Sequence, residues 1–244
     1  MNSNPIQSSF EDLYLKTREK EGRLYPDEIV SFLPEVPKTH PLFREWLIRK
    51  LSFEKFRDYL VQKNKPLNIL DLGCGNGWMS NKLCEINGSV VTGFDKNSFE
   101  INQAKRVFQN NTRLNFYSDE DFSETNVVND TFDVVVMAAS IQYFPDLKQL
   151  MNQLFPLLNP EGEIHILDSP FYSQQDVARA KESSKEHYTK LECIEMAGYY
   201  HHHAWEELSG IHHKIINRSL IDKFLLKTFK TKKNYFPWVI IYKS

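Results

Sequence analysis

The most restrictive feature of the chain is the stretch Leu67–Asp168, in which short apolar segments alternate with polar segments of helical length. This alternation is typical of parallel strands joined by crossover helices. The predicted strands are Asn68–Leu72, Ser89–Phe94, Leu114–Tyr117, Phe132–Ala138 and Gly162–Leu167, and the helix-length segments between them are Gly77–Asn87, Ser98–Asn110 and Leu147–Leu158. The unbroken apolar run Val134–Met137 fits a strand that is covered on both faces. We therefore expect an α/β fold with a doubly wound sheet.

The segments on either side of this stretch differ in character. Residues 1–65 are rich in aromatic and charged side chains, with helical spacing over His40–Val61 and prolines that break the segment into short pieces. We predict that residues 1–65 form a helical N-terminal extension, or cover, and that residues 66–244 form one domain. Ser169–Gly210 is expected to be helical and polar, and Trp238–Tyr242 to be a final strand.

Composition excludes several classes of protein. Thirty basic residues against thirty-two acidic ones do not give the electrostatic footprint of an obligate nucleic-acid binder. The three cysteines have no metal-ligand spacing, so we expect reduced thiols and no metal site. The longest apolar run, Val134–Ala139, is too short to cross a membrane, and the first ten residues lack the features of a secretory signal. The expected location is the cytoplasm, without a membrane partner.

The most informative segment is Ile69–Trp78, where a strand leads into a glycine-rich turn and then into a helix. Gly73, Gly75 and Gly77 permit positive φ angles and a close approach of a ligand, and the helix N-terminus beyond them offers unpaired amides. Asp95 follows the next strand, whose end lies beside the glycine loop in a doubly wound sheet. The arrangement predicts a site for a nucleotide-like ligand, with Asp95 accepting hydrogen bonds from both ribose hydroxyls.

The spacing of the glycines separates two classes of nucleotide site. A dinucleotide-binding loop that starts at Gly73 would place its last small residue at Trp78, where an indole would oppose close packing of helix and strand. The observed pattern is D-x-G-x-G-x-G, beginning at Asp71. A carboxylate beside the loop would repel a pyrophosphate but suits the ammonium of a methionine moiety. The segment resembles motif I of the class I S-adenosylmethionine-dependent methyltransferases.

The resemblance covers roughly Pro66–Asp168. Val91–Asp95 is similar to the second motif of the family, and Phe132–Val136 followed by Ser140–Phe144 resembles its fourth strand and the loop that runs past the reactive methyl. Leu157–Ile164 resembles the turn into the fifth strand. The resemblance implies a Rossmann-like methyltransferase fold, with a doubly wound, mostly parallel seven-stranded sheet, and S-adenosylmethionine as the cofactor.

The resemblance also implies a set of cofactor-binding residues. Asp121 would bind the adenine amine with Phe122 beside the base, although an alignment on Asp119 is also possible. The full set is Asp71, Gly73, Cys74, Gly75, Gly77, Asp95, Lys96, Asp121, Phe122, Ala139 and Ser140.

Residues that handle the acceptor are harder to assign, because methyl transfer needs a dedicated base only for some acceptors. Gln142, Asp168 and Tyr172 are candidates, since they follow strands whose carboxyl ends should meet at the cofactor. Gln142 could equally lie on a loop surface, and Asp168 and Tyr172 could be a helix cap and a core residue. The His201–His203 cluster does not make a metal site by itself, because adjacent side chains point in different directions, and we expect His165 to be structural.

We expect the chain to transfer a methyl group to a small-molecule acceptor. Ser140–Tyr143 stands where enzymes that methylate DNA bases carry an Asn/Asp-Pro-Pro-Tyr/Phe element, and none of the three cysteines follows a proline. The alternatives are an RNA or protein methyltransferase and a binding module without turnover. A nucleic-acid acceptor, although disfavoured, would use the basic run Lys223, Lys227, Lys230, Lys232 and Lys233, which is more often a solvated face. Core packing explains Trp46 equally well, and the residues that resemble the helical cover that in this family closes over the cofactor are Tyr14, Arg18, Arg23, Tyr25 and Trp46.

Overall fold

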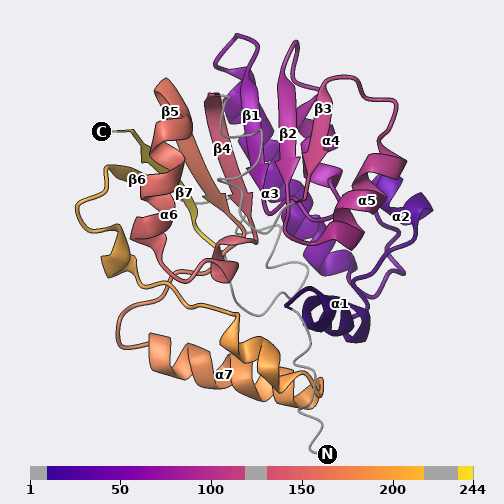
Figure 1. The fold of residues 1–244 in the computed structure, drawn as a ribbon, viewed down its shortest axis with the longest axis vertical. Coiled ribbons are helices and arrows are strands. Elements are labelled where there is room, and N and C mark those ends of the chain that lie inside the picture. Colours follow the sequence, from indigo (N-terminus) through magenta and orange to yellow (C-terminus); the bar gives the residue numbers. More distant parts are fainter. Residues whose placement is uncertain (1–9, 119–130, 217–235, 244) are drawn as a thin grey trace, which may run out of the picture.

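The computed structural model describes residues 10–118, 131–216 and 236–243. Its centre is a seven-stranded sheet in the order β3-β2-β1-β4-β5-β7-β6 (Figure 1). The strands are β1 (Asn68–Leu72), β2 (Val90–Phe94), β3 (Leu114–Tyr117), β4 (Phe132–Ala138), β5 (Leu158–Leu167), β6 (His213–Ile216) and β7 (Trp238–Tyr242). The first five strands are parallel, whereas β7 is antiparallel to both β5 and β6. The predicted doubly wound, mostly parallel seven-stranded sheet is therefore confirmed.

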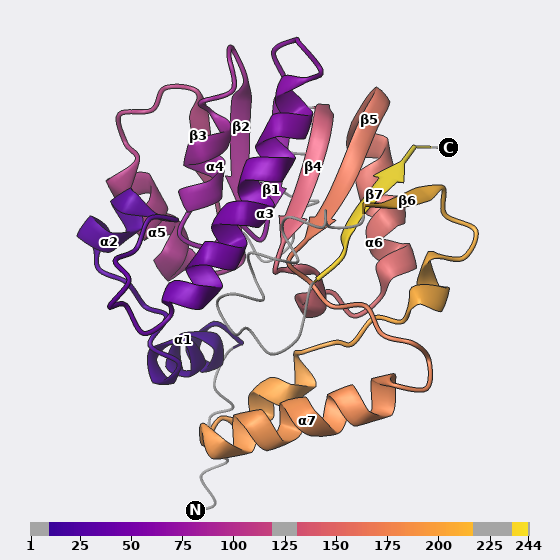
Figure 2. The ribbon, with the colours of Figure 1, turned by 180° about the vertical axis from the view of Figure 1, so that it is seen from behind.

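Helices cover both faces of this sheet. The α-helices are α1 (Phe10–Lys20), α2 (Asp27–Phe32), α3 (Phe43–Val61), α4 (Trp78–Leu83), α5 (Ser98–Val107), α6 (Leu147–Leu154) and α7 (Val177–Lys190). Short 3-10 helices are η3 (Ile141–Tyr143), η4 (Phe155–Leu157), η5 (Ile194–Gly198) and η6 (Trp205–Leu208). Helix α6 lies on the near face of the sheet in Figure 1, and α3 lies on the opposite face, seen in Figure 2.

Alternation along the strands divides the apolar core between these two faces, because successive side chains of a strand point to opposite sides. Leu70 and Val135 pack with α6, whereas Ile69 and Val134 pack with α3 and α4. Helix α3 buries Trp46, Phe53, Phe56 and Leu60 in this second layer. The last helix of the predicted extension thus shares a core with the sheet, and the boundary between residues 65 and 66 stays a prediction.

Several elements differ from the expected boundaries. Helix α6 ends at Leu154, because Pro156 in the following turn cannot donate a backbone hydrogen bond. Strand β5 begins at Leu158 rather than Gly162, since Leu158 pairs with Phe132.

The expectation that residues 169–210 are helical is correct for α7 and two short 3-10 turns but wrong for the remainder. Tyr172 accepts a backbone hydrogen bond from Trp205 (3.0 Å) and donates one to His203 (3.0 Å), so this part of the backbone is paired in an extended bridge. No described helix begins at Asp168, whose φ of 51° is left-handed. Asp168 is therefore not a helix cap.

The register of β1 and β2 fixes where a ligand site can form. The two strands pair from Asn68 with Val90 to Leu72 with Phe94, so both end at the same level of the sheet. The loop that follows β1 and the residue that follows β2 consequently emerge side by side. Helices α1 and α7 lie beyond this carboxyl end of the strands (Figures 1 and 2).

Gly77, the N-cap of α4, tests how closely this helix packs against β3 and α5. Its φ is 76°, and a Cβ there would lie 2.4 Å from Phe116 and 2.9 Å from Ala104. Gly77→Ala should lower the free energy of unfolding by roughly 1 to 3 kcal/mol more than Gly210→Ala does. Gly210 is the matched control, since its φ is 81° and nothing lies within 4 Å of its Cβ position. Urea denaturation measures the free energy of unfolding of both variants. Equal losses would show that the contacts of Gly77 with Phe116 and Ala104 do not add to the cost of the substitution.

Candidate active site

The glycine loop after β1 is held by the end of β2. Phe94 accepts backbone hydrogen bonds from Gly73 (2.7 Å) and Cys74 (3.1 Å). The Asp95 carboxylate accepts from the Gly75 amide through Oδ2 (2.8 Å) and from the Asn97 amide through Oδ1 (2.8 Å). The loop and the acid that the sequence singled out are therefore in direct contact.

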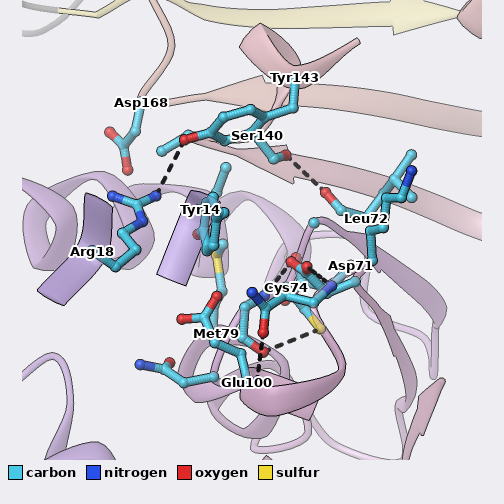
Figure 3. A pocket seen from close by; sticks show the side chains of 18 of the residues that line it. Tyr14, Arg18, Asp71, Leu72, Cys74, Met79, Glu100, Ser140, Tyr143 and Asp168 are labelled. Atoms are coloured by element: carbon cyan, nitrogen blue, oxygen red, sulfur yellow. Dashed lines mark hydrogen bonds between the residues drawn. The ribbon is translucent and has the colours of Figure 1, made fainter. Parts of the chain in front are cut away.

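The first glycine of the loop is required by close contact with the end of β4. A Cβ on Gly73, whose φ is 79°, would lie 2.4 Å from the Ser140 Cβ. The Ser140 hydroxyl donates to the Leu72 carbonyl (2.8 Å), as Figure 3 shows. This contact fixes Ala139 and Ser140 beside the loop.

A cavity of about 560 Å³ lies over the loop, within the range of small-molecule and cofactor sites. Eight of the predicted cofactor residues line it: Asp71, Gly73, Cys74, Gly75, Asp95, Lys96, Ala139 and Ser140. Gly77 lies just beyond, at the start of α4, and Asp121 and Phe122 fall outside the described residues. Other lining residues come from α1, α3 and α5 and include Tyr14, Arg18, Trp46, Arg49 and Glu100.

Asp71 is a buried carboxylate on the floor of this cavity. It is 1% exposed and accepts a hydrogen bond from the Ser80 hydroxyl (2.6 Å). Burial raises the pKa of Asp71 to about 7, with a smaller contribution from the charge of Asp95, while the Ser80 hydrogen bond acts against the rise. The charged form is thus disfavoured, because it has left water for an environment without a countercharge.

Glu100, which our reading of the sequence did not single out, adds a further acid to the cavity. The side chain is 8% exposed, and its Oε2 atom is buried without a hydrogen-bond partner. Burial and the neighbouring charge of Asp95 raise the pKa of Glu100. The sequence did indicate where Glu100 would lie. Asn97 is the N-cap of α5 and accepts from the Glu100 amide, so Glu100 stands in the first helical turn after Asp95.

Helix α1 covers the cavity and contacts both the start of α5 and the 3-10 helix η3. The Glu11 carboxylate accepts from the Ser98 amide (2.7 Å) at the start of α5. The Arg18 guanidinium stacks on the Tyr14 ring at 4.7 Å and lies 3.5 Å from the Tyr143 hydroxyl, which it faces in Figure 3. Tyr14 and Arg18 both line the cavity, and the role of residues 1–65 as a cover stays a prediction.

The segment from α1 to α3 supplies the remaining cover residues. Both Arg23 and Arg49 donate to the carboxylate of Glu45, which keeps the pKa of Glu45 low, at about 2, despite its burial. The Trp46 indole donates to the Tyr25 hydroxyl (3.0 Å). These contacts form one connected wall above the glycine loop.

A second cavity of about 890 Å³ adjoins the first and shares Tyr14, Arg18, Tyr143 and Asp168 with it. Its walls carry both apolar and polar side chains: besides Ile48, Ala139, Pro170, Met196 and Phe236, they include Thr17, Glu21, Arg44, Gln142, Ser183, Ser184, His187, Tyr188 and Tyr200. The two spaces meet at the carboxyl ends of β4 and β5.

The three acceptor-side candidates occupy different places. Asp168 lines both cavities, and Gln142 lines the second. The Gln142 amide, however, donates to the Ala139 carbonyl (2.6 Å) and so also supports the loop after β4. Tyr172 lines neither cavity and packs against His202 at 5.5 Å between ring centroids.

The side chains of His165, His202 and His203 have partners within the protein. His203 contacts Glu207 (3.0 Å) and the Ile141 carbonyl (3.1 Å), and His202 contacts the Ser184 hydroxyl (2.9 Å). Buried His165 lies between Glu163 (3.1 Å) and the indole of Trp238 (3.0 Å). In the described part of the chain, no group of His, Cys, Asp and Glu could hold a metal ion.

Comparison with known proteins identifies the family. A family model described as a methyltransferase domain matches residues 63–234, which is more than half of the chain. The chain belongs to the methyltransferase domain family. This methyltransferase is 25% identical to the methyltransferase phqN of Penicillium fellutanum over 50% of the chain and 38% of phqN. It is 25% identical to the sterol 24-C-methyltransferase of Debaryomyces hansenii over 45% of the chain and 29% of that enzyme.

A further relative is the malonyl-[acyl-carrier protein] O-methyltransferase of Bacillus anthracis, 32% identical over 43% of this methyltransferase and 38% of the enzyme. The matched segments thus span well under half the length of these curated relatives.

Two solved structures share the fold of this methyltransferase. Magnesium protoporphyrin IX methyltransferase (ChlM) from Synechocystis PCC 6803 with bound SAM gives a TM-score of 0.59 at 12% identity, covering 99% of this chain and all of ChlM. The plantazolicin methyltransferase BpumL in complex with SAH gives 0.55 at 20% identity, covering 96% of each chain. Among the described residues, none of the helices is long and apolar enough to cross a membrane.

Asp71→Asn tests the cost of the buried acid. Because the folded-state pKa of Asp71 is about 7, above its unfolded value near 4, the carboxylate leaves stability unaffected below pH 4 and destabilises increasingly up to pH 7. At pH 8 the asparagine variant should therefore unfold at a higher temperature than the parent, with a free energy of unfolding higher by up to about 4 kcal/mol, and the difference should shrink at pH 5. Scanning calorimetry at both pH values checks this, and a pH-independent difference would contradict it.

Proposed function

We propose that this methyltransferase domain transfers the methyl group of S-adenosylmethionine to a polar small-molecule acceptor. The observation that carries the proposal is the direct contact between the glycine loop after β1 and Asp95 after β2, above a cavity of cofactor size. Membership of the methyltransferase domain family supports it independently.

The residues present fit such a donor. The backbone of Gly73 and Gly75 lines the cavity, and the atoms nearest to a Cβ on Gly75 would be the Glu100 carboxylate oxygens, at 3.5 Å. The acids Asp71, Asp95 and Glu100 line a space where their own charges are poorly compensated. A cationic ligand rich in hydroxyl groups would repair this deficit, whereas a pyrophosphate would worsen it.

When bound, the sulfonium supplies an electrophilic methyl group and leaves with the electron pair of the broken carbon–sulfur bond. The protein mainly supplies binding and alignment. We assign Asp95 to the ribose hydroxyls, the backbone of Gly73, Cys74 and Gly75 to the amino-acid portion, and Ala139 and Ser140 to the wall beside the reacting centre. Asp121 and Phe122 remain proposed for the adenine.

The second cavity supports a polar acceptor, because guanidinium, phenol, hydroxyl and imidazole groups make up much of its wall. A large apolar acceptor would remove water from the charged and hydroxyl groups of that wall, which is costly for any of them that lacks a partner within the protein. Asp168 is proposed as the acceptor-side acid or base, since it lies where the two cavities meet.

Calorimetric titration with S-adenosylmethionine and with S-adenosylhomocysteine tests the proposal. Both should bind at one site in a folded sample. A folded protein that gives no saturable binding of either ligand would exclude the function. Mass spectrometry of reactions with matched polar and apolar acceptors then tests the proposed acceptor class. Methyl transfer to apolar acceptors alone would contradict the proposal of a polar acceptor.

Asp95→Ala should weaken binding of S-adenosylmethionine by about 1.5 to 3 kcal/mol, the usual range for a hydrogen bond to a charged group. Asp95→Asn keeps an acceptor for the Gly75 amide and should give a smaller loss. Asp58→Ala is the control, because Asp58 is exposed and pairs only with Arg57 at the surface. Unchanged affinity in the alanine variant would refute the ribose assignment.

A further inference from the structure

Glu100 is an unusual acid among the described residues, because it is buried and incompletely paired. Its side chain is 8% exposed, and Oε2 has no hydrogen-bond partner. Burying a carboxylate in this state is costly unless a positive charge or donor completes its surroundings. The side chain lines the cavity over the glycine loop, which we call the donor cavity. Figure 3 shows Glu100 directed into that space beneath Tyr14.

The cations nearest to Glu100 are committed elsewhere. Arg18 pairs with Glu21 (3.3 Å), and Arg49 pairs with Glu45 (3.1 Å). Among the residues that the structure describes, no cation lies within ion-pair distance of the Glu100 carboxylate.

The other groups that face Glu100 act on its charge in opposite directions. Burial and the carboxylate of Asp95, at the end of β2, raise the pKa of Glu100. The hydroxyl of Tyr14 and the guanidinium groups of Arg18 and Arg49, from α1 and α3, partly offset that rise. The pKa of Glu100 stays raised, so the negative charge of its carboxylate is only partly compensated by its neighbours.

The position of this carboxylate relative to the loop indicates which ligand group it would meet. Its two oxygens lie 3.5 Å from where a Gly75 Cβ would stand, and Gly75 is bound by Asp95, the proposed ribose acid. In S-adenosylmethionine, one methylene carbon joins the ribose ring to the sulfonium. A group beside the ribose site is therefore within reach of the sulfur.

We propose that Glu100 compensates the positive charge of the donor sulfonium and thereby makes the site select S-adenosylmethionine over S-adenosylhomocysteine. This inference rests on the proposed function. After methyl transfer the sulfur is neutral, so Glu100 would again be buried without a countercharge. The product complex is consequently the weaker one, which favours its release.

Calorimetry with these two ligands measures the selectivity as the ratio of their dissociation constants. The parent protein should bind S-adenosylmethionine more tightly, and Glu100→Gln should reduce that preference by about tenfold, chiefly by weakening the cationic ligand. Glu19→Gln is the matched control, because Glu19 is exposed on α1 and lines neither cavity. It should leave the ratio unchanged.

A second variant, Glu100→Leu, removes the charge without a polar replacement and should shift the ratio in the same direction. The ligand-free Glu100→Gln protein should also unfold at a higher temperature than the parent, which confirms folding and the cost of the buried acid. An unchanged ratio, or equal weakening of both ligands, would overturn the inference while leaving the proposed function intact. Absence of any binding by the parent would instead remove the proposed function, and this inference with it.

Discussion

The hydrogen bond from the Gly75 amide to the Asp95 carboxylate is the interaction on which the rest of the site depends. It joins two loops that are adjacent only because β1 and β2 pair in register and end at the same level. Since Asp95 also accepts from Asn97, one carboxylate fixes both the glycine loop and the start of α5. The cavity above the loop, and the orientation of Glu100 toward it, follow from that arrangement.

The donor cavity lies over a hydrogen-bonded glycine loop and contains several buried carboxylates. Among the carboxylates that line it, Asp71, Asp95 and Glu100 have raised pKa values, mainly because burial disfavours the charged forms. Burial of these acids lowers the stability of the ligand-free protein, and under the proposed function a cationic donor would offset that cost. The cover from α1 and α3 closes the space while pairing most of its own arginines with Glu21 and Glu45.

Predictions from the sequence were most successful where a local rule sets the structure. The sequence predicted β1, β3, β4 and β7 at their observed bounds. In β4 and β7 the reason is that a strand buried on both faces leaves a continuous apolar signature. Prediction was poorer between residues 169 and 210, where Tyr172 pairs with Ala204 across a long loop. That pairing depends on contacts between distant segments, and no local periodicity records it. Glu100 was missed for a related reason, since an acid in the first turn of a helix is ordinary until its surroundings are known.

The sequence by itself determined the doubly wound sheet, the glycine loop and the acid that follows the second strand. These are set by hydrophobic periodicity, by positive φ angles that favour glycine, and by the rule that parallel strands present their carboxyl ends together. Only the tertiary structure decided which side chains share the cavity, because burial and charge compensation arise from residues far apart in the chain. It placed Asp168 at the junction of the two cavities, moved Tyr172 away from both, and left Glu100 buried with an unpaired oxygen.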